Sequence, residues 1–231
     1  MGLLQIFYEP AKVFERVREK KEWLPPFIAS MLLVVLLMFV AINTIGMESI
    51  TRKQMEKNPR TEEMLGKDKY EEAIHSSNTP ARKAMTFVFA AIAGGLVIVV
   101  VAAAMLAVFS MTGAAVKFPQ MLGATGYSMF PFQVLTVVMS VLIMLVATDK
   151  ADLDMQNLVA TNVGAYLNRA TTGKFLMSFA TSMDLISFGQ IAFLAYGLSK
   201  VTLASYTKSL MLVIVCWAMY VIVKSGLSGL F

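Results

Sequence analysis

The chain has 231 residues, of which 57% are hydrophobic and only 15% are charged, whereas a soluble domain usually carries about a quarter charged residues. Its net charge of +5 comes from basic residues interleaved with acidic ones, which does not indicate nucleic-acid binding. The single cysteine, Cys216, excludes an internal disulfide and a cysteine-based metal cluster, and no cofactor is expected.

Three long runs contain no Asp, Glu, Lys or Arg: residues 23–47, 84–116 and 118–148. A bilayer core of about 30 Å needs roughly 20 apolar residues in a helix, and each run exceeds that length. Because hydrocarbon offers no partners to backbone amides, such segments must satisfy their own hydrogen bonds as helices. The sequence therefore predicts an all-α, polytopic integral membrane protein.

Residues 1–24 are predicted to form an amphipathic N-terminal segment, ahead of a membrane domain at 25–231. Within it, residues 7–21 predict a surface helix, because apolar residues recur at three- and four-residue spacing. These positions are Phe7, Pro10, Val13, Phe14 and Val17. Such a helix either lies in the headgroup plane or packs on the protein's own loops, and the pattern alone does not choose between them.

The first span is expected at about 25–46, with Trp23 at its interfacial edge, where indoles are enriched. Residues 47–83 follow as the only sizeable polar segment, predicted to be a loop with a short amphipathic helix. The pair Asn58-Pro59 is typical of a break with a new helix start. The lone histidine, His75, is expected to be a solvated side chain.

The second span, at about 84–112, is rich in small residues. Gly94 follows Ala90 by four residues, and Gly95 follows Ala91 by the same spacing, which lets helix backbones approach closely. Gly94 and Gly95 are therefore candidate packing positions. Ordinary packing within the chain is the favoured interpretation, and assembly between copies is the alternative.

The third span follows a polar connection at 117–120. Its first half carries Gly126, Tyr127 and Pro131, and the proline is expected to kink the helix or to mark its start. Gln133 belongs to a sparse polar set in this span, and in lipid such side chains prefer a neighbouring helix.

Residues 149–174 predict loops around a partly interfacial helix. A fourth span in part of 175–199 and a fifth at about 209–229 give five spans, with four or six as alternatives. Five basic residues immediately before the first span resist translocation, so a cytoplasmic N-terminus is expected. The plain count opposes this orientation, since that side holds eight basic residues and the other side twelve.

Asp184 is the only charge in the fourth span and the main candidate for a functional residue, because a carboxylate at mid-bilayer costs roughly 2.5–3.5 kcal/mol. If the fourth helix begins at Phe175, Asp184 lies near its middle. If the helix begins at Ser182, Asp184 lies in the first turn, where the free N–H groups stabilise its charge. The sequence Ser182-Met183-Asp184 is typical of a helix start, so the structural anchor is the favoured interpretation.

Enzyme signatures are missing from the sequence. It contains no His-Glu-x-x-His, no Gly-x-Ser-x-Gly and no Gly-rich phosphate loop. One histidine and one cysteine in different environments argue against a catalytic triad, and an aspartyl mechanism needs two facing carboxylates. The chain is therefore not expected to be an enzyme.

Several short motifs resemble the Yip family, the Ypt/Rab-interacting-protein domain. The entry into the first span, Pro10…Phe14…Trp23-Leu24-Pro25-Pro26, is similar to the family's own. The stretch from Leu122 to Pro131 resembles its Gly-Tyr-then-Pro signature. Two further pieces, Ser182 to Phe188 and Ala195-Tyr196-Gly197-Leu198, resemble the helix-four region of bacterial members, although Gly189 stands where a Trp is common.

The resemblance implies a five-helix fold with a cytoplasmic N-terminus, and no catalytic residues come with it. Eukaryotic relatives bind Rab-type GTPases and act in vesicle traffic between the ER and the Golgi. This chain lacks their long N-terminal extension and is more similar to bacterial members. A small GTPase partner is therefore implied by family analogy alone, and the bacterial inner membrane is expected in preference to the ER or Golgi.

Two functions are compatible with these features. The first is a non-enzymatic membrane-organising or scaffolding protein whose partners are lipids, its own copies or another membrane protein, with no nucleic acid. The second is a small-solute or lipid transporter, with Asp184 and the Pro131 region lining the path. The candidate residues, functional or structural, are Asp184, Tyr127, Pro131, Gly126, Ser182 and Gln133.

Overall fold

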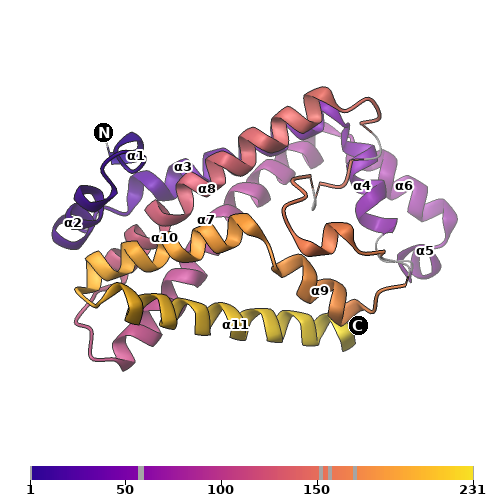
Figure 1. Cartoon of the computed structure of the whole chain (residues 1–231). Coiled ribbons are helices and arrows are strands. Elements are labelled where there is room, and N and C mark those ends of the chain that lie inside the picture. Colours follow the sequence, from indigo (N-terminus) through magenta and orange to yellow (C-terminus); the bar gives the residue numbers. More distant parts are fainter. Residues whose placement is uncertain (1, 57–59, 151–152, 156–157, 169–170, 231) are drawn as a thin grey trace. The chain divides into compact units, whose positions relative to one another are not determined.

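In the computed structural model, the described residues are 2–56, 60–150, 153–155, 158–168 and 171–230, and they form an all-α fold (Figure 1). A short 3₁₀ helix, η1, covers Val163–Tyr166. The α-helices are α1 (Gly2–Gln5), α2 (Pro10–Lys20), α3 (Leu24–Thr44), α4 (Met47–Glu56), α5 (Arg60–Leu65), α6 (Lys67–Ser77), α7 (Pro80–Met111), α8 (Phe118–Val146), α9 (Lys174–Ser182), α10 (Leu185–Thr202) and α11 (Tyr206–Leu230).

Five of these helices are long and apolar enough to cross a bilayer: α3, α7, α8, α10 and α11. They confirm the predicted number of spans and the polytopic membrane architecture. The ends move by a few residues, as α7 begins at Pro80 and α11 at Tyr206. Both extensions place a charged or polar first turn at the edge of an apolar helix, which suits the membrane–water interface.

The fourth span differs from the single helix that was expected. The chain forms α9, breaks at Met183 and Asp184, and resumes as α10. A helix start at Ser182 is therefore wrong, because Ser182 ends α9. The break is local: the backbone of Asp184 is extended, and it pairs with Asn162 in an isolated antiparallel bridge.

Pro131 lies inside α8, which begins thirteen residues earlier at Phe118, so the alternative that it marks the helix start is wrong. The helix continues because proline removes only one donor, the N–H that would otherwise bond the Tyr127 carbonyl. Neighbouring helices support such a helix in a membrane.

The chain divides into two compact units. The first unit contains Met1–Ser30, Gly95–Val134 and Ala160–Phe231, with α1, α2, η1, α9, α10 and α11 and parts of α3, α7 and α8. Its core is the first half of α8, where all ten residues at 121–130 are buried. A span buried on every side is enclosed by protein rather than by lipid.

The second unit contains Met31–Gly94 and Leu135–Val159. Here α3 packs against α7, and the Phe39 and Phe87 rings lie with centroids 6.3 Å apart. The segment at 47–83, predicted as a loop, is mostly helical and forms α4, α5 and α6. The predicted break at Asn58-Pro59 lies outside the described residues.

Helices α4 and α6 are held together by a bidentate ion pair. Arg52 donates from Nη1 and Nη2 to the two carboxylate oxygens of Glu71, each at 2.9 Å. These hydrogen bonds lower the pKa of the Glu71 carboxyl from its ordinary value and raise that of the Arg52 guanidinium. Tyr70 and Ile74, one turn apart on α6, supply the buried apolar stripe.

Candidate functional site

The amphipathic helix α2 is docked onto the membrane domain. Its three innermost side chains, Val13, Phe14 and Val17, are fully buried, and α2 packs along α10. The apolar stripe is narrower than the sequence suggested, because Phe7 is 52% exposed and precedes the helix. The predicted packing on the protein itself is present, with the spanning helix α10 as the surface instead of loops.

Phe14 occupies a slot over Gly197 of α10. A Cβ on Gly197 would lie 2.6 Å from Phe14 Cε1 and 2.7 Å from the Ser128 hydroxyl oxygen of α8. The ring also makes edge contacts with Phe193 and Tyr196, at centroid distances of 5.8 and 6.0 Å. Only glycine leaves room for the ring there, so residue 197 sets the distance between α2 and α10.

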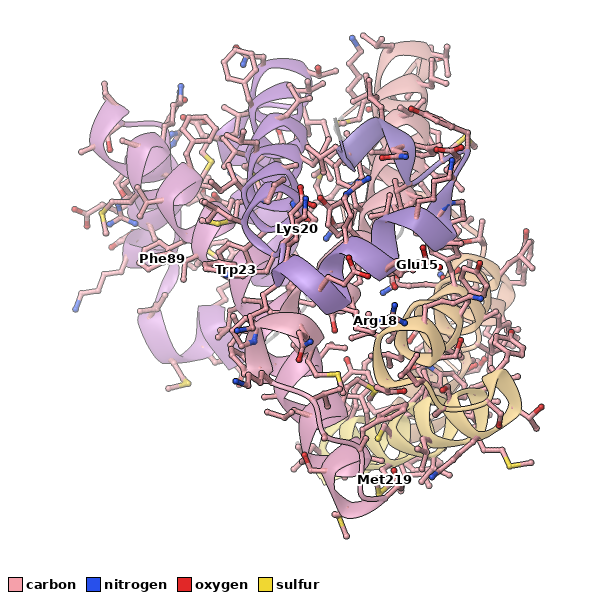
Figure 2. The ribbon with its side chains drawn as sticks, turned by 90° about the vertical axis from the view of Figure 1, so that its left-hand side faces the viewer. Glu15, Arg18, Lys20, Trp23, Phe89 and Met219 are labelled. Carbon is pink, nitrogen blue, oxygen red and sulfur yellow. The ribbon has the colours of Figure 1, made fainter. Side chains whose placement is uncertain are left out.

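The C-terminal end of α2 is tied to two spans. The Arg18 guanidinium donates to the carbonyl of Lys200 in the last turn of α10, at 3.3 Å, and Figure 2 shows Arg18 between α2 and that helix. The Gln120 amide of α8 donates in turn to the Arg18 carbonyl at 2.6 Å. These bonds satisfy carbonyls that helix ends leave without intrahelical partners.

The chain then turns sharply into α3 against α8. Lys21 has a left-handed backbone, with φ of 54°, and its N–H bonds the Val17 carbonyl. The turn packs closely against two glycines of α8. A Cβ added to Gly123 would lie 2.8 Å from the Glu22 carbonyl oxygen, and a Cβ added to Gly126 would lie 3.2 Å from the Pro26 side chain. The two glycines thus let α8 meet the chain entering the first span.

Tyr127, beside Gly126, is fully buried. Its hydroxyl oxygen would lie 2.6 Å from a Cβ on Gly2 at the start of α1. Within the described part of the chain, four side-chain oxygens of α8 have no hydrogen-bond partner although they are buried. They belong to Thr125, Tyr127, Ser128 and Gln133.

Asp184 is the N-cap of α10. Its carboxylate accepts from the backbone N–H and the hydroxyl of Ser187, each at 2.8 Å, and from the Thr161 hydroxyl. Both oxygens are therefore engaged in local bonds that orient the helix start. Ser182 is buried at the end of α9 and accepts a 3.1 Å hydrogen bond from the Lys224 ammonium of α11.

Gly94 and Gly95 are both buried in α7. A Cβ on Gly94 would lie 3.0 Å from Val34 Cγ2 and 3.6 Å from the Met31 Cα atom. Gly94 therefore faces α3 of the same chain, and its close contact is intramolecular.

Replacing Gly94 with leucine is expected to push α3 and α7 apart and to destabilise the protein by about 1–3 kcal/mol, the usual cost of overpacking. Ala93→Leu is the matched control, because Ala93 is exposed on the same helix. Unfolding in mixed detergent–SDS micelles, followed by circular dichroism, measures the difference. Equal stability of the two variants would contradict the proposed packing.

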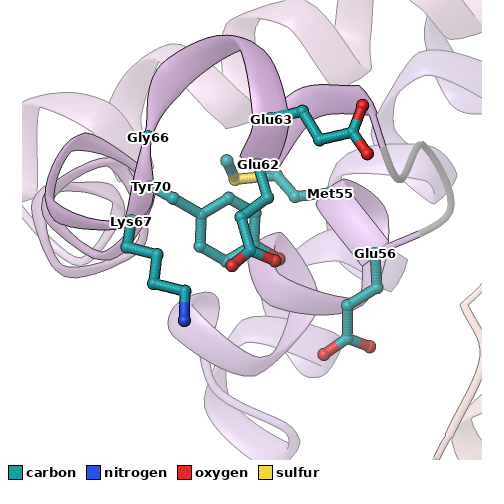
Figure 3. Close-up of a pocket in the computed structure, with 7 residues that line it drawn as sticks. All are labelled: Met55, Glu56, Glu62, Glu63, Gly66, Lys67 and Tyr70. Atoms are coloured by element: carbon teal, nitrogen blue, oxygen red, sulfur yellow. The ribbon is translucent and has the colours of Figure 1, made fainter.

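A cavity of about 690 Å³ lies among α4, α5 and α6 (Figure 3). It is lined by three carboxylates, with Tyr70 and Met55 on the apolar side. Among the described residues, no group of three or more His, Cys, Asp or Glu side chains is arranged to hold a metal ion.

A family model of the Yip1 domain matches residues 4–226. The chain belongs to the Yip1 domain family. The match starts within α1 and ends within α11, so it includes the docked N-terminal helix and all five spans, and it confirms the resemblance drawn from short motifs. Neither the curated proteins nor the solved structures compared with the chain include a significant match.

Those motifs coincide with close contacts of this Yip1 domain. Gly126 and Tyr127 meet the N-terminal segment, and Gly197 receives Phe14. Gly189 stands where the resemblance implies a common Trp. A Cβ on Gly189 would lie 2.8 Å from Cε1 of the Phe132 ring. No sequence pattern indicated that Gln120 and Arg18 are tethers, because both have the character of ordinary polar residues at a helix end.

Proposed function

We propose that this Yip1-domain protein is a non-enzymatic membrane-organising protein that acts through contacts with lipids and with other copies of itself. The supporting observation is the docking of α2: its apolar stripe is buried in the membrane domain, and four of its charged residues are exposed, namely Lys12, Glu15, Glu19 and Lys20. Figure 2 shows Glu15 and Lys20 on that helix. Residues 12–22, the charged part of α2 and the turn after it, are called the platform below. In this proposal the platform lies at headgroup level as a fixed part of the membrane domain.

The lateral surface of the spans supports the same role. Only 17% of the most apolar window of α3, and of α11, is buried inside the chain. The remaining surface of both helices meets lipid or a neighbouring membrane protein, since the bilayer contains no other apolar phase. A protein with two such open helices is suited to lateral association.

The platform lies on the cytoplasmic side of a bacterial inner membrane in this proposal. Five basic residues precede α3 within the platform: Lys12, Arg16, Arg18, Lys20 and Lys21. Basic residues flanking the first span are retained in the cytoplasm, and the anionic lipids of that leaflet attract them.

The test is energy transfer between labelled copies in liposomes of phosphatidylcholine. A single label is placed on Lys67→Cys, an exposed position, in a Cys216→Ser background. Transfer above the value for random mixing is expected, and it should fall in the Gly197→Leu variant, which displaces α2. The control is Gly226→Leu, because an added Cβ there meets nothing within 4 Å. Random mixing of the wild-type protein would rule out the proposal.

A second candidate, a solute or lipid transporter, has two specific observations in its favour. Among the described residues, the first half of α8 holds buried oxygens without hydrogen-bond partners, and the chain interrupts its helical path at Met183 and Asp184, between α9 and α10. Discontinuous helices form substrate sites in many transporters. Solute flux in proteoliposomes that is lost in Asp184→Asn would favour this function.

A further inference from the structure

A small cavity of about 420 Å³ lies in the first unit beside the platform, lined by Gly2, Arg16, Lys20 and Glu22. The level of this cavity relative to the membrane follows from the residues that come directly after it in the sequence. Glu22 is followed by Trp23, a residue type of the membrane interface, and α3 begins at Leu24. The cavity is therefore at the level of the lipid headgroups.

Two charged side chains of this cavity, Arg16 and Glu22, are held in place by hydrogen bonds. Arg16 donates from Nη1 to Gln5 Oε1 at 2.5 Å and from Nε to Glu22 Oε2 at 3.3 Å. Its Nη2 lies toward Gly2, 3.1 Å from the position of a Cβ on that residue. Lys20 lines the same space. Two cations and one carboxylate thus face one cavity, and a hydrogen bond fixes the spacing of Arg16 and Glu22.

The buried hydroxyl of Tyr127 lies on the Gly2 side of this cavity. A Cβ on Gly2 would be 2.6 Å from its oxygen, and within the residues that the structure describes this hydroxyl meets no hydrogen-bond partner. Buried polar groups are normally satisfied. The Tyr127 hydroxyl itself is buried and does not line the cavity, so the contacts to a ligand would come from Arg16, Lys20 and Glu22.

The charges of Arg16, Lys20 and Glu22 in the cavity lining favour a zwitterionic ligand. A ligand with phosphate alone would place negative charge beside Glu22, and a purely cationic ligand would meet Arg16 and Lys20. A quaternary ammonium has no N–H to donate, whereas a primary ammonium donates to a carboxylate. We propose that this cavity binds a phosphoethanolamine group, with its phosphate on Arg16 and Lys20 and its ammonium on Glu22.

This inference rests on the lipid-contacting role proposed above and names the lipid. The group is carried by phosphatidylethanolamine or occurs as free phosphoethanolamine. The headgroup-level position of the cavity, directly before α3, fits the lipid-borne form.

The test uses the purified full-length chain in detergent micelles, with Trp23 as the fluorescent reporter in a Trp217→Phe background. Short-chain phosphatidylethanolamine, phosphatidylcholine and phosphatidylglycerol are titrated separately. The ethanolamine lipid is expected to bind about tenfold more tightly than the choline lipid, the usual gain from one charged hydrogen bond. Glu22→Gln should abolish this preference, and the neighbouring Glu19→Gln should keep it.

A second variant keeps the test decisive if Glu22→Gln fails to fold. Lys20→Gln, at an exposed position, should weaken binding of all three lipids by about tenfold through loss of a phosphate contact. Lys21→Gln is its control, because Lys21 does not line the cavity. Equal wild-type affinity for the ethanolamine and choline lipids, or unchanged binding in Lys20→Gln, would overturn the inference.

Competition identifies the source of the group. Displacement of the bound lipid by free phosphoethanolamine supports the soluble form, and an intact lipid preference without displacement supports the lipid-borne form. The inference can fail alone, since the energy-transfer test uses liposomes without ethanolamine lipid. Random mixing there, with the lipid preference intact, would remove only the proposed function.

Discussion

Replacing Gly197 with leucine should force Phe14 out of its slot and detach α2 from the spans. The new Cβ would start 2.6 Å from the Phe14 ring and 2.7 Å from the Ser128 hydroxyl, and neither α8 nor α10 can retreat without opening a buried core. We expect a loss of about 1–3 kcal/mol or more from overpacking. Phe14→Ala, which empties the same slot, should cost about 3–5 kcal/mol.

The two substitutions should compensate when they are combined. Leucine at position 197 fills part of the space that alanine at position 14 vacates, so the double variant should be more stable than the sum of the two single losses by about 1 kcal/mol or more. Detergent–SDS unfolding gives the three free energies, and trypsin cleavage after the lysines of α2 reports its release. Gly226→Leu should match the wild type, since the space around Gly226 is open. Strict additivity would show that Phe14 and Gly197 do not share a slot.

Asp184→Ala is expected to loosen the junction of α9 and α10. The change removes the N-cap of α10, worth about 0.5–2 kcal/mol, and also leaves Thr161 and Ser187 without the carboxylate that both contact. Asp184→Asn keeps one acceptor oxygen for the Ser187 N–H, so its loss of stability should be smaller. Hydrogen exchange of the first turn of α10 measures both effects locally.

The same pair of variants separates the anchor from a transport role. If Asp184 only orients the helix, Asp184→Asn should keep most of the exchange protection and leave solute flux unchanged, while Asp184→Ala raises exchange near Leu185. Exchange that is unchanged in Asp184→Ala would contradict the capping role. Loss of flux in Asp184→Asn with normal protection would instead assign the carboxylate to a path.

Local composition was enough to predict the spans. Charge-free runs set where α3, α7 and α8 lie, because no charged side chain is tolerated cheaply in hydrocarbon. Asp184 marked the start of a helix through its neighbours, since capping depends on residues within one turn. The Gly126-Tyr127 motif pointed to the family, although the sequence did not show what the two residues touch.

The helical extent of 47–83 was underestimated for a related reason, since only one short helix was predicted where α4, α5 and α6 form. Its residues are polar, and polarity without a long apolar stripe is typical of loops. Arg52 and Glu71 are 19 residues apart, so their ion pair becomes visible only when α4 and α6 are folded side by side.

The sequence by itself determined that this is a five-span membrane protein of the Yip type with an amphipathic start, because hydropathy and capping act over one helix at a time. Only the tertiary structure decided where that start lies. Phe14 and Gly197 are 183 positions apart, and the fit of a ring over a glycine is a property of two surfaces in contact. The same holds for the small cavity, because Gly2, Arg16, Lys20 and Glu22 come together only when α1 and α2 have folded against each other.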